Sequence, residues 1–146
     1  MTETTFTTEI YVQAPPERVL EFLADLSDRN ELHPLIVSVE ELDVPGKKFR
    51  RYRITDRVPM GPFKIKAVYE ADMWRDEDGN LCSIARQSPG IVLHNTTTAI
   101  PKGDGTLLCE VVSVKAPSLL RDFVLRQARE SDQEMFERAN ALLEAE

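Results

Sequence analysis

A single glutamate interrupts an apolar stretch near the end of the sequence. Glu110 lies in LLCEVVSVK (107–115), where an alternating pattern places Leu108 and Val112 on its side of a predicted strand. A carboxylate in an apolar cavity has a raised pKa, and it could bind a polar ligand group or act as a general acid or base. The alternative is a glutamate that faces solvent or pairs with an arginine such as Arg86, and the sequence leaves both interpretations open.

Other polar side chains interrupt predicted apolar faces. Tyr52 and Tyr69 lie on the apolar faces of two neighbouring predicted strands, where their hydroxyls could meet a polar ligand group or a partner within the core. Gln127 and Ser131 interrupt the apolar line of the last predicted helix. They indicate either a partly wet cavity or a place where helix and sheet approach closely.

The histidines and cysteines do not indicate a metal or a nucleophile. His33 and His94 are far apart without an acidic cluster, and Cys82 and Cys109 form no Cys-x-x-Cys pair, so we expect free thiols, no metal and no cofactor. Nucleophile-elbow, phosphate-loop, dinucleotide and zinc-protease motifs are absent. Pro34 disfavours the helical conformation at His33, which predicts a hinge there between a helical segment and the second strand.

The composition restricts the classes of partner. Eighteen Lys and Arg oppose 25 Asp and Glu, a net charge of -7, which disfavours nucleic acid and anionic lipid surfaces as partners. No apolar stretch approaches the ~20 residues that span a bilayer, and the N-terminus lacks a secretory pattern. We therefore expect one cytoplasmic domain over residues 1–146, without stable membrane insertion.

The elements that must position these side chains follow from periodicity. A helix is predicted within 14–27, because Pro15 and Pro16 suit a first helical turn, and it should end near Ser27 or Asp28. Its buried positions are Val19, Phe22, Leu23 and Leu26. Period-two alternation and turn signals predict seven strands, at 4–13, 35–44, 47–58, 63–74, 81–87, 91–100 and 107–115.

The chain closes with one long predicted helix. Leu120, Val124, Met135, Ala139 and Leu142 lie along one line at helical spacing, in a helix of about 26 residues and roughly 40 Å. No other predicted helix has a similar length, so the line must pack on the sheet or on another subunit. A helix laid across the concave face of a twisted antiparallel sheet leaves a cavity between the two.

Two stretches carry a resemblance to a known family. The pattern VQAPPERVLEFLADL…LHPLI with a diffuse Ala-Pro-x-x-x-Val signature, and EVVSVKAPSLLRDFV before the closing helix, resembles the START-like helix-grip superfamily (SRPBCC type). The most similar branch is the polyketide cyclase/dehydrase and lipid-transport group. The resemblance implies an α+β helix-grip fold: a seven-stranded, strongly curved antiparallel sheet wrapped around a long C-terminal helix, with one or two short helices between strands 1 and 2.

The resemblance also implies an apolar ligand under the closing helix. If the 101–106 connection has an even number of loop residues, Leu93, Asn95 and Thr97 face inward with Glu110, and an odd number reverses this. The residues that we expect to contact ligand are Tyr52, Ile54, Met60, Phe63, Ile65, Tyr69, Leu93, Asn95, Thr97, Glu110, Val112, Gln127, Ser131 and Met135.

Two further features have alternative interpretations. VPMGP (58–62) is expected to be a loop, either a mobile apolar lid at the cavity mouth or a tight hairpin with an exposed methionine. The arginines of FRRYRITDR (49–57) form either a partner-binding patch or ion pairs with Glu40, Glu70 and Asp72.

Three functions fit these observations. The first is binding or transport of an apolar or amphipathic small molecule by a monomer or homodimer. The second is a cyclase or dehydratase that uses Glu110 with Tyr52 or Tyr69 as acid/base groups. The third is a protein-interaction module, which a continuous apolar patch outside the core would favour.

Overall fold

The computed structural model describes residues 2–25 and 35–144. Within these ranges it has the predicted helix-grip architecture. A short helix follows the first strand, six strands follow that helix, and a long helix follows the last strand. In chain order the elements are β1 (Thr2–Val12), α1 (Pro16–Ala24), β2 (Ile36–Leu42), β3 (Arg50–Met60), β4 (Phe63–Arg75), β5 (Leu81–Gln87), β6 (Ile91–Lys102), β7 (Gly105–Ala116) and α2 (Arg121–Glu144).

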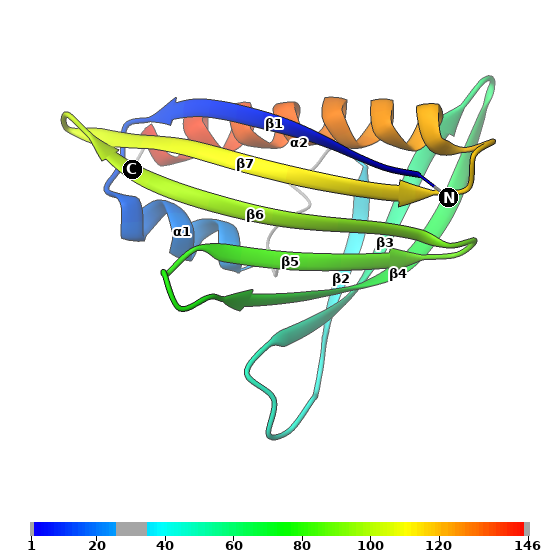
Figure 1. Cartoon of the computed structure of the whole chain (residues 1–146), viewed down its shortest axis with the longest axis horizontal. Helices are drawn as coiled ribbons and strands as arrows, with labels where there is room; N and C mark the ends of the chain where they lie inside the picture. The colour runs from blue at the N-terminus through cyan, green and yellow to red at the C-terminus, as the bar shows by residue number, and fades with distance from the viewer. Residues whose placement is uncertain (1, 26–34, 145–146) are drawn as a thin grey trace.

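All seven strands form one antiparallel sheet in the order β1-β7-β6-β5-β4-β3-β2. Strands β2 to β7 follow one another as a meander, and β1 joins the far edge beside β7. Figure 1 shows that β2, β3 and β4 cross steeply behind the level of β5, β6 and β7, so the sheet is strongly twisted and curls around α2.

The first helix is shorter than its pattern predicts. Pro15 precedes the helix in an extended conformation and Pro16 occupies its first turn, as expected, because the missing N–H of proline costs nothing there. The helix ends at Ala24 rather than at Ser27 or Asp28, since Asp25 is already extended. Leu26, His33 and Pro34, with the hinge predicted there, lie outside the described residues.

The buried stripe of α2 is rotated from the predicted line. Asp132, Phe136, Ala139 and Leu143 are buried, whereas Leu142 is 39% exposed. Spacings of four, three and four residues keep the buried four on one face of a 3.6-residue helix, and Leu142 lies beyond its edge. The helix has 24 residues.

Helix α2 rests on one half of the sheet only. It packs mainly against β1 and β7, where Phe6, Val112 and Val114 meet the first turns of the helix and Leu108 meets Phe136 nearer its end. On the other half, a separate core forms around residues of β2, β3 and β4: Ile36, Tyr52, Ile54 and Ala71. Because the helix does not reach this second core, space is left between them.

The stretch 58–62 is a tight hairpin with an exposed methionine, one of its two interpretations, and not a separate loop. Strand β3 continues to Met60, which pairs with Phe63 across the two-residue turn Gly61–Pro62. Gly61 has a φ of 62°, which the first central position of a type II′ turn requires. Pro59 fits within β3 because the pairing of β3 with β2 stops at Asp56. Beyond Asp56 one side of β3 is an edge, where a proline without an N–H is tolerated.

Candidate ligand cavity

A cavity of about 460 Å³ lies between α2 and the concave face of the sheet. Ligand pockets in proteins are commonly ~300–1,000 Å³ and mainly apolar, with a few polar groups. Most of the wall here is aliphatic or aromatic, including Ile54, Ile65, Met73, Leu93, Val112, Phe123, Val124 and Phe136. The size and the lining are therefore those of a small-molecule site.

The cavity is closed at one end and open at the other. At the closed end its wall includes Leu23 of α1 and Leu81 of β5, both about 5% exposed. At the other end it is bordered by Met60 and Ile65, which are 40% and 45% exposed, and by the β5–β6 turn at Ser88 and Pro89. We call this second end the mouth. In Figure 1 it is the end where the β3–β4 hairpin, the β5–β6 turn and the start of α2 come together.

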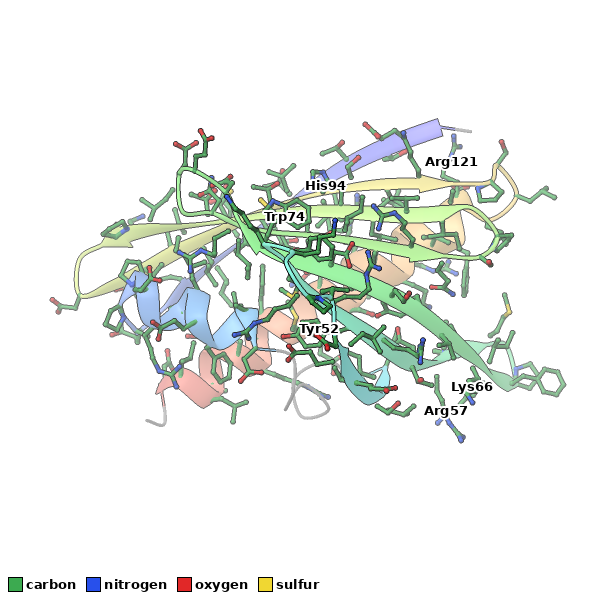
Figure 2. The ribbon with its side chains drawn as sticks, turned by 90° about the horizontal axis from the view of Figure 1, so that it is seen from below. Tyr52, Arg57, Lys66, Trp74, His94 and Arg121 are labelled. Carbon is green, nitrogen blue, oxygen red and sulfur yellow. The ribbon has the colours of Figure 1, made fainter. Side chains whose placement is uncertain are left out.

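Most residues that were expected to contact ligand line this cavity. They are Ile54, Met60, Ile65, Tyr69, Leu93, Asn95, Thr97, Glu110, Val112, Gln127, Ser131 and Met135. The β6–β7 connection has two loop residues, because Lys102 pairs with Gly105. This even number turns Asn95 and Thr97 inward with Glu110. His94 points to the outer face, where its ring stacks on Trp74 at 6.2 Å between centroids (Figure 2).

Two of the expected residues do not line the cavity. Tyr52 is fully buried among Ile36, Ile54 and Ala71, so its ring fills the core beside the cavity instead of facing the open space. Phe63 has the correct strand face but is 71% exposed, because it lies at the tip of the β3–β4 hairpin beyond the cavity wall. Alternation assigns the side of a strand, but it does not tell how far the covering helix reaches.

Glu110 faces the cavity from the middle of β7 and is 4% exposed. The register places Thr8 of β1 and Thr97 of β6 on either side of it, and the Thr97 hydroxyl donates a 2.9 Å hydrogen bond to Glu110 Oε2. Burial, together with the neighbouring carboxyl group of Asp132, raises the pKa of Glu110 well above its usual value. Glu110 therefore retains a proton under conditions where an exposed glutamate has lost it.

Asp132, the partner of Glu110, is not among the residues predicted from the sequence. Asp132 projects from α2 and is 8% exposed; burial raises its pKa, while hydrogen bonds with Glu110 and Thr8 oppose that rise. Two buried carboxyl groups in contact are stable when they share one proton, because two adjacent negative charges repel each other. A signal was present: Ala128, Asp132 and Phe136 are spaced by four residues, so a carboxylate interrupts the apolar stripe.

A second buried acid was also missed. Asp56 of β3 is 7% exposed and lines the cavity, and the Tyr69 hydroxyl, diagonally across on β4, hydrogen-bonds to its carboxylate. Burial raises the pKa of Asp56 to about 6, although the bond from Tyr69 opposes the rise. Burial and the negative charge of Asp56 raise the pKa of Tyr69 well above its usual value. Alternation from Ile54 to Val58 through Asp56 would have identified this residue as inward-facing.

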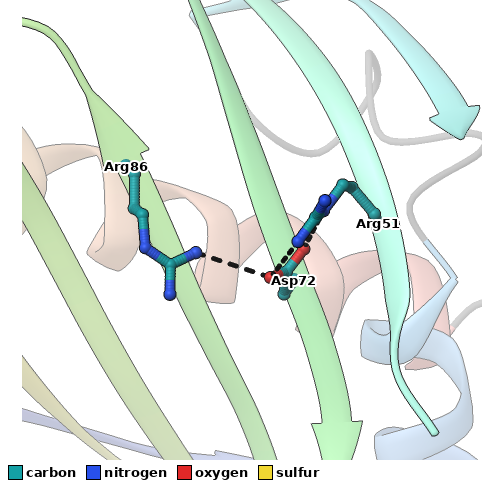
Figure 3. Close-up of polar contacts among 3 residues, drawn as sticks. All are labelled: Arg51, Asp72 and Arg86. Carbon is teal, nitrogen blue, oxygen red and sulfur yellow. Dashed lines mark hydrogen bonds and ion pairs between the residues drawn. The ribbon is translucent and has the colours of Figure 1, made fainter. Parts of the chain in front are cut away.

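Two arginines of β3, Arg51 and Arg53, form ion pairs on the outer face, as one of the two interpretations expected. Arg51 makes a two-pronged contact with Asp72, with distances of 2.7 and 3.1 Å, and Arg86 approaches Asp72 Oδ2 at 3.4 Å (Figure 3). Arg53 lies 3.7 Å from Glu40. These contacts hold the pKa of Asp72 below its usual value, with the hydrogen bond from Arg51 as the main cause.

Other kinds of site find no support in the described ranges 2–25 and 35–144. They contain no group of three or more His, Cys, Asp or Glu side chains arranged to hold a metal ion. Neither of the helices described there combines the length and apolar character that crossing a membrane requires. Cys82 and Cys109 are free thiols.

Comparisons with known proteins give a family match and a set of similar structures. The family model described as "Polyketide cyclase / dehydrase and lipid transport" matches residues 3–145. No curated protein matches the sequence. The crystal structure of TTHA0849 from Thermus thermophilus is similar at 23% identity, with a TM-score of 0.77 over 97% of this chain and 98% of that one.

Two further solved structures are similar at lower identity. The Zhui aromatase/cyclase from Streptomyces sp. R1128 has a TM-score of 0.81 at 15% identity, over 98% of this chain and 94% of that one. A START superfamily protein from Mycobacterium smegmatis has a TM-score of 0.75 at 15% identity, over 97% of both chains. At these identities the likeness establishes the fold, and function must be argued from the cavity.

Proposed function

Because this chain belongs to the polyketide cyclase / dehydrase and lipid transport family, we propose that it binds an apolar or amphipathic small molecule in the cavity under α2. The observation that carries the proposal is the cavity itself, about 460 Å³ with a mainly apolar wall and a small number of inward polar groups. Burial of an apolar ligand body contributes about 25 cal/mol for each Å² removed from water. The inward carboxyl and amide groups would fix the orientation of the ligand's polar end.

The arrangement of the wall suggests how a ligand enters. The mouth is bordered by exposed apolar side chains, Met60 and Ile65, and the closed end by buried ones, Leu23 and Leu81. An elongated ligand would therefore place its apolar body along the axis of α2 and enter between the β3–β4 hairpin and the start of that helix. The cavity wall supplies its polar contacts from β3, β4, β5, β6, β7 and α2.

A cavity-blocking variant tests the proposal. Ala85 lines the cavity from β5, so Ala85→Phe should fill part of it, whereas Val111→Phe on the outer face of β7 adds a ring without touching it. We expect native mass spectrometry and thermal-shift measurements with single-chain amphiphiles to show binding by the wild type and by Val111→Phe. Ala85→Phe should bind at least tenfold more weakly. Equal binding by both variants, or no binding by any folded protein, would refute the proposal.

A second candidate function is catalysis of the cyclase or dehydratase type, and the Glu110–Asp132 pair favours it. The pair holds a proton in a water-poor cavity beside the position of a bound ligand, where a general acid or base is effective. Tyr69 also lines the cavity and could assist, whereas Tyr52 does not reach it. A positioned acid/base group typically contributes about 10²–10⁴ in rate.

Glu110→Gln separates the two candidates. The amide keeps the shape of the side chain and can still accept a hydrogen bond from Thr97, but it cannot transfer a proton. For an enzyme we expect loss of turnover with retained ligand affinity and retained fold, measured with a polyketide-like substrate. An activity that survives this change would exclude Glu110 as the acid/base group.

A further inference from the structure

The ionisable side chains of the described cavity wall are all acids. They are Asp56 of β3, Tyr69 of β4, Glu110 of β7 and Asp132 of α2; the described lining residues of α1, β1, β2, β5 and β6 are not ionisable. The outer face provides a contrast, because Asp72 there is matched by two arginines. Inside the cavity, no described lysine, arginine or histidine balances the carboxyl groups.

The buried polar atoms of the wall that lack a protein partner are all hydrogen-bond acceptors. They are Oδ1 of Asp56, Oδ1 of Asn95, Oε1 of Glu110 and Oδ2 of Asp132. A proton shared by Glu110 and Asp132 can satisfy the last two of these oxygens, because one carboxyl group then donates a hydrogen bond that the other accepts. The oxygens of Asp56 and Asn95 still require donors, because an unsatisfied buried polar group costs about 1–3 kcal/mol.

The ionisation of Asp56 at neutral pH follows from its pKa of about 6: the carboxyl group is mostly ionised, and Tyr69 beside it is neutral. Burial raises the pKa of both Glu110 and Asp132, so this pair holds a proton more readily than exposed acids do. A ligand therefore meets the carboxylate of Asp56 and several acceptor oxygens in a cavity where water screens charges poorly.

We propose that the ligand of this cavity is a cationic amphiphile, an apolar body with a protonated amine that donates to the carboxylate of Asp56. This inference rests on the proposed function, since it names the ligand class for the same cavity. Tyr69 holds the carboxylate through its hydroxyl, and the free Oδ1 of Asp56 accepts the N–H of the amine. The Glu110–Asp132 pair lines the same cavity from β7 and α2.

The same arrangement excludes anionic ligands. A fatty-acid carboxylate or a phosphate group would bring a like charge and further acceptors beside Asp56, whose free oxygen requires a donor. A neutral alcohol could donate one hydrogen bond but would gain no charge attraction. The expected order of affinity is therefore amine, then alcohol, then carboxylate, for ligands with identical apolar chains.

The test compares dodecylamine, dodecanol and dodecanoate below their aggregation limits, by isothermal titration calorimetry at pH 7.5. We expect dodecylamine to bind at least ~10-fold more tightly than dodecanol, a difference of about 1.4 kcal/mol, and dodecanoate to bind most weakly. Asp56→Asn should lose at least ~10-fold in amine affinity while its alcohol affinity changes less than ~2-fold. Asp104→Asn removes the same charge from an exposed turn and should behave as the wild type.

A pH series supplies an independent readout. Lowering the pH from 7.5 to 5 protonates Asp56 but leaves the amine charged, so amine affinity should fall more in the wild type than in Asp56→Asn, where of the cavity carboxyl groups only Glu110 and Asp132 still titrate. Dodecanoate binding as tightly as dodecylamine, or an unchanged amine affinity in Asp56→Asn, would refute the cationic ligand while the proposed binding function stands. Absence of binding by all three compounds to folded protein would refute both.

Discussion

Thr97 on β6 and Glu110 on β7 lie directly opposite each other, and the Thr97 hydroxyl donates a 2.9 Å hydrogen bond to Oε2 of the glutamate. Both side chains are at most 4% exposed. The bond lowers the pKa of Glu110, against the larger effects of burial and of Asp132, which raise it. The β6–β7 pairing thus moderates the raised pKa of this cavity acid.

Loss of this bond should destabilise the protein. Thr97→Val keeps the side-chain shape but leaves Oε2 of Glu110 buried without a donor, so we expect the free energy of unfolding to fall by about 1–2 kcal/mol. Thr98→Val, one residue along on the outer face, should change it by less than about 0.5 kcal/mol. Urea denaturation at pH 7 measures both. Equal effects would show that the bond has no energetic role.

Asp56→Asn should stabilise the unliganded protein at neutral pH. Asp56 retains its proton to about pH 6 in the folded chain but only to its usual 3.8 when unfolded, so folding becomes less favourable as the pH rises between these values. The difference amounts to about 2–3 kcal/mol above pH 6. Asparagine removes the charge and still accepts from Tyr69.

The pH dependence identifies the cause of that gain. The stabilisation by Asp56→Asn should be full at pH 7.5, fall to about 1 kcal/mol near pH 4.5, and vanish below the unfolded pKa. Urea denaturation at these pH values measures it. A gain independent of pH would point to packing instead of ionisation.

The two arginines around Asp72 should contribute unequally. Arg51→Ala removes a two-pronged contact, which leaves a nearly buried carboxylate with one distant partner, and should cost about 1–2 kcal/mol. Arg86→Ala removes a single 3.4 Å contact from a side chain that is 57% exposed and should cost less than about 0.5 kcal/mol. The Arg51 contribution should be present above the usual pKa of Asp72 and disappear as the pH falls through its lowered folded value.

Truncation of two phenylalanines should change the free energy of unfolding by very different amounts. Phe136 is 1% exposed and packs in the core at the closed end, so Phe136→Ala should cost about 3–5 kcal/mol. Phe63 is 71% exposed at the hairpin tip, so Phe63→Ser should leave the free energy of unfolding within about 0.5 kcal/mol of the wild type. A large loss for Phe63→Ser would mean that this ring is covered in solution.

Much of the fold was predictable because its signals are local. Period-two alternation, turn glycines and the long closing helix predicted the element order. They left open which side of β6 faces inward, which depends on the two-residue β6–β7 turn seen in the structure. The family resemblance is confirmed by the match over residues 3–145. Helix boundaries were less accurate, since α1 ends where Asp25 becomes extended and no sequence signal marks that residue.

The candidate site was predictable in outline but not in its acids. Glu110 was identified because it interrupts a strongly apolar strand. Asp56 and Asp132 were missed although strand alternation and helical spacing place them on inward faces, because they lie in segments rich in charge, where most carboxylates are solvated. The exclusion of Tyr52 and Phe63 also depends on where α2 rests on the sheet, a tertiary relationship that periodicity does not contain.

The pairing of the first strand with the last has a consequence for synthesis of the chain. Strands β2 to β7 join through short turns and can form in order as they leave the ribosome, but β1 must wait for β7, its neighbour in the described sheet, since Thr2 pairs with Ala116. Loop closure over such a separation is slow relative to hairpin formation. We expect β1 to stay unpaired during synthesis until β7 has been made, and a chaperone that binds extended segments would find it there.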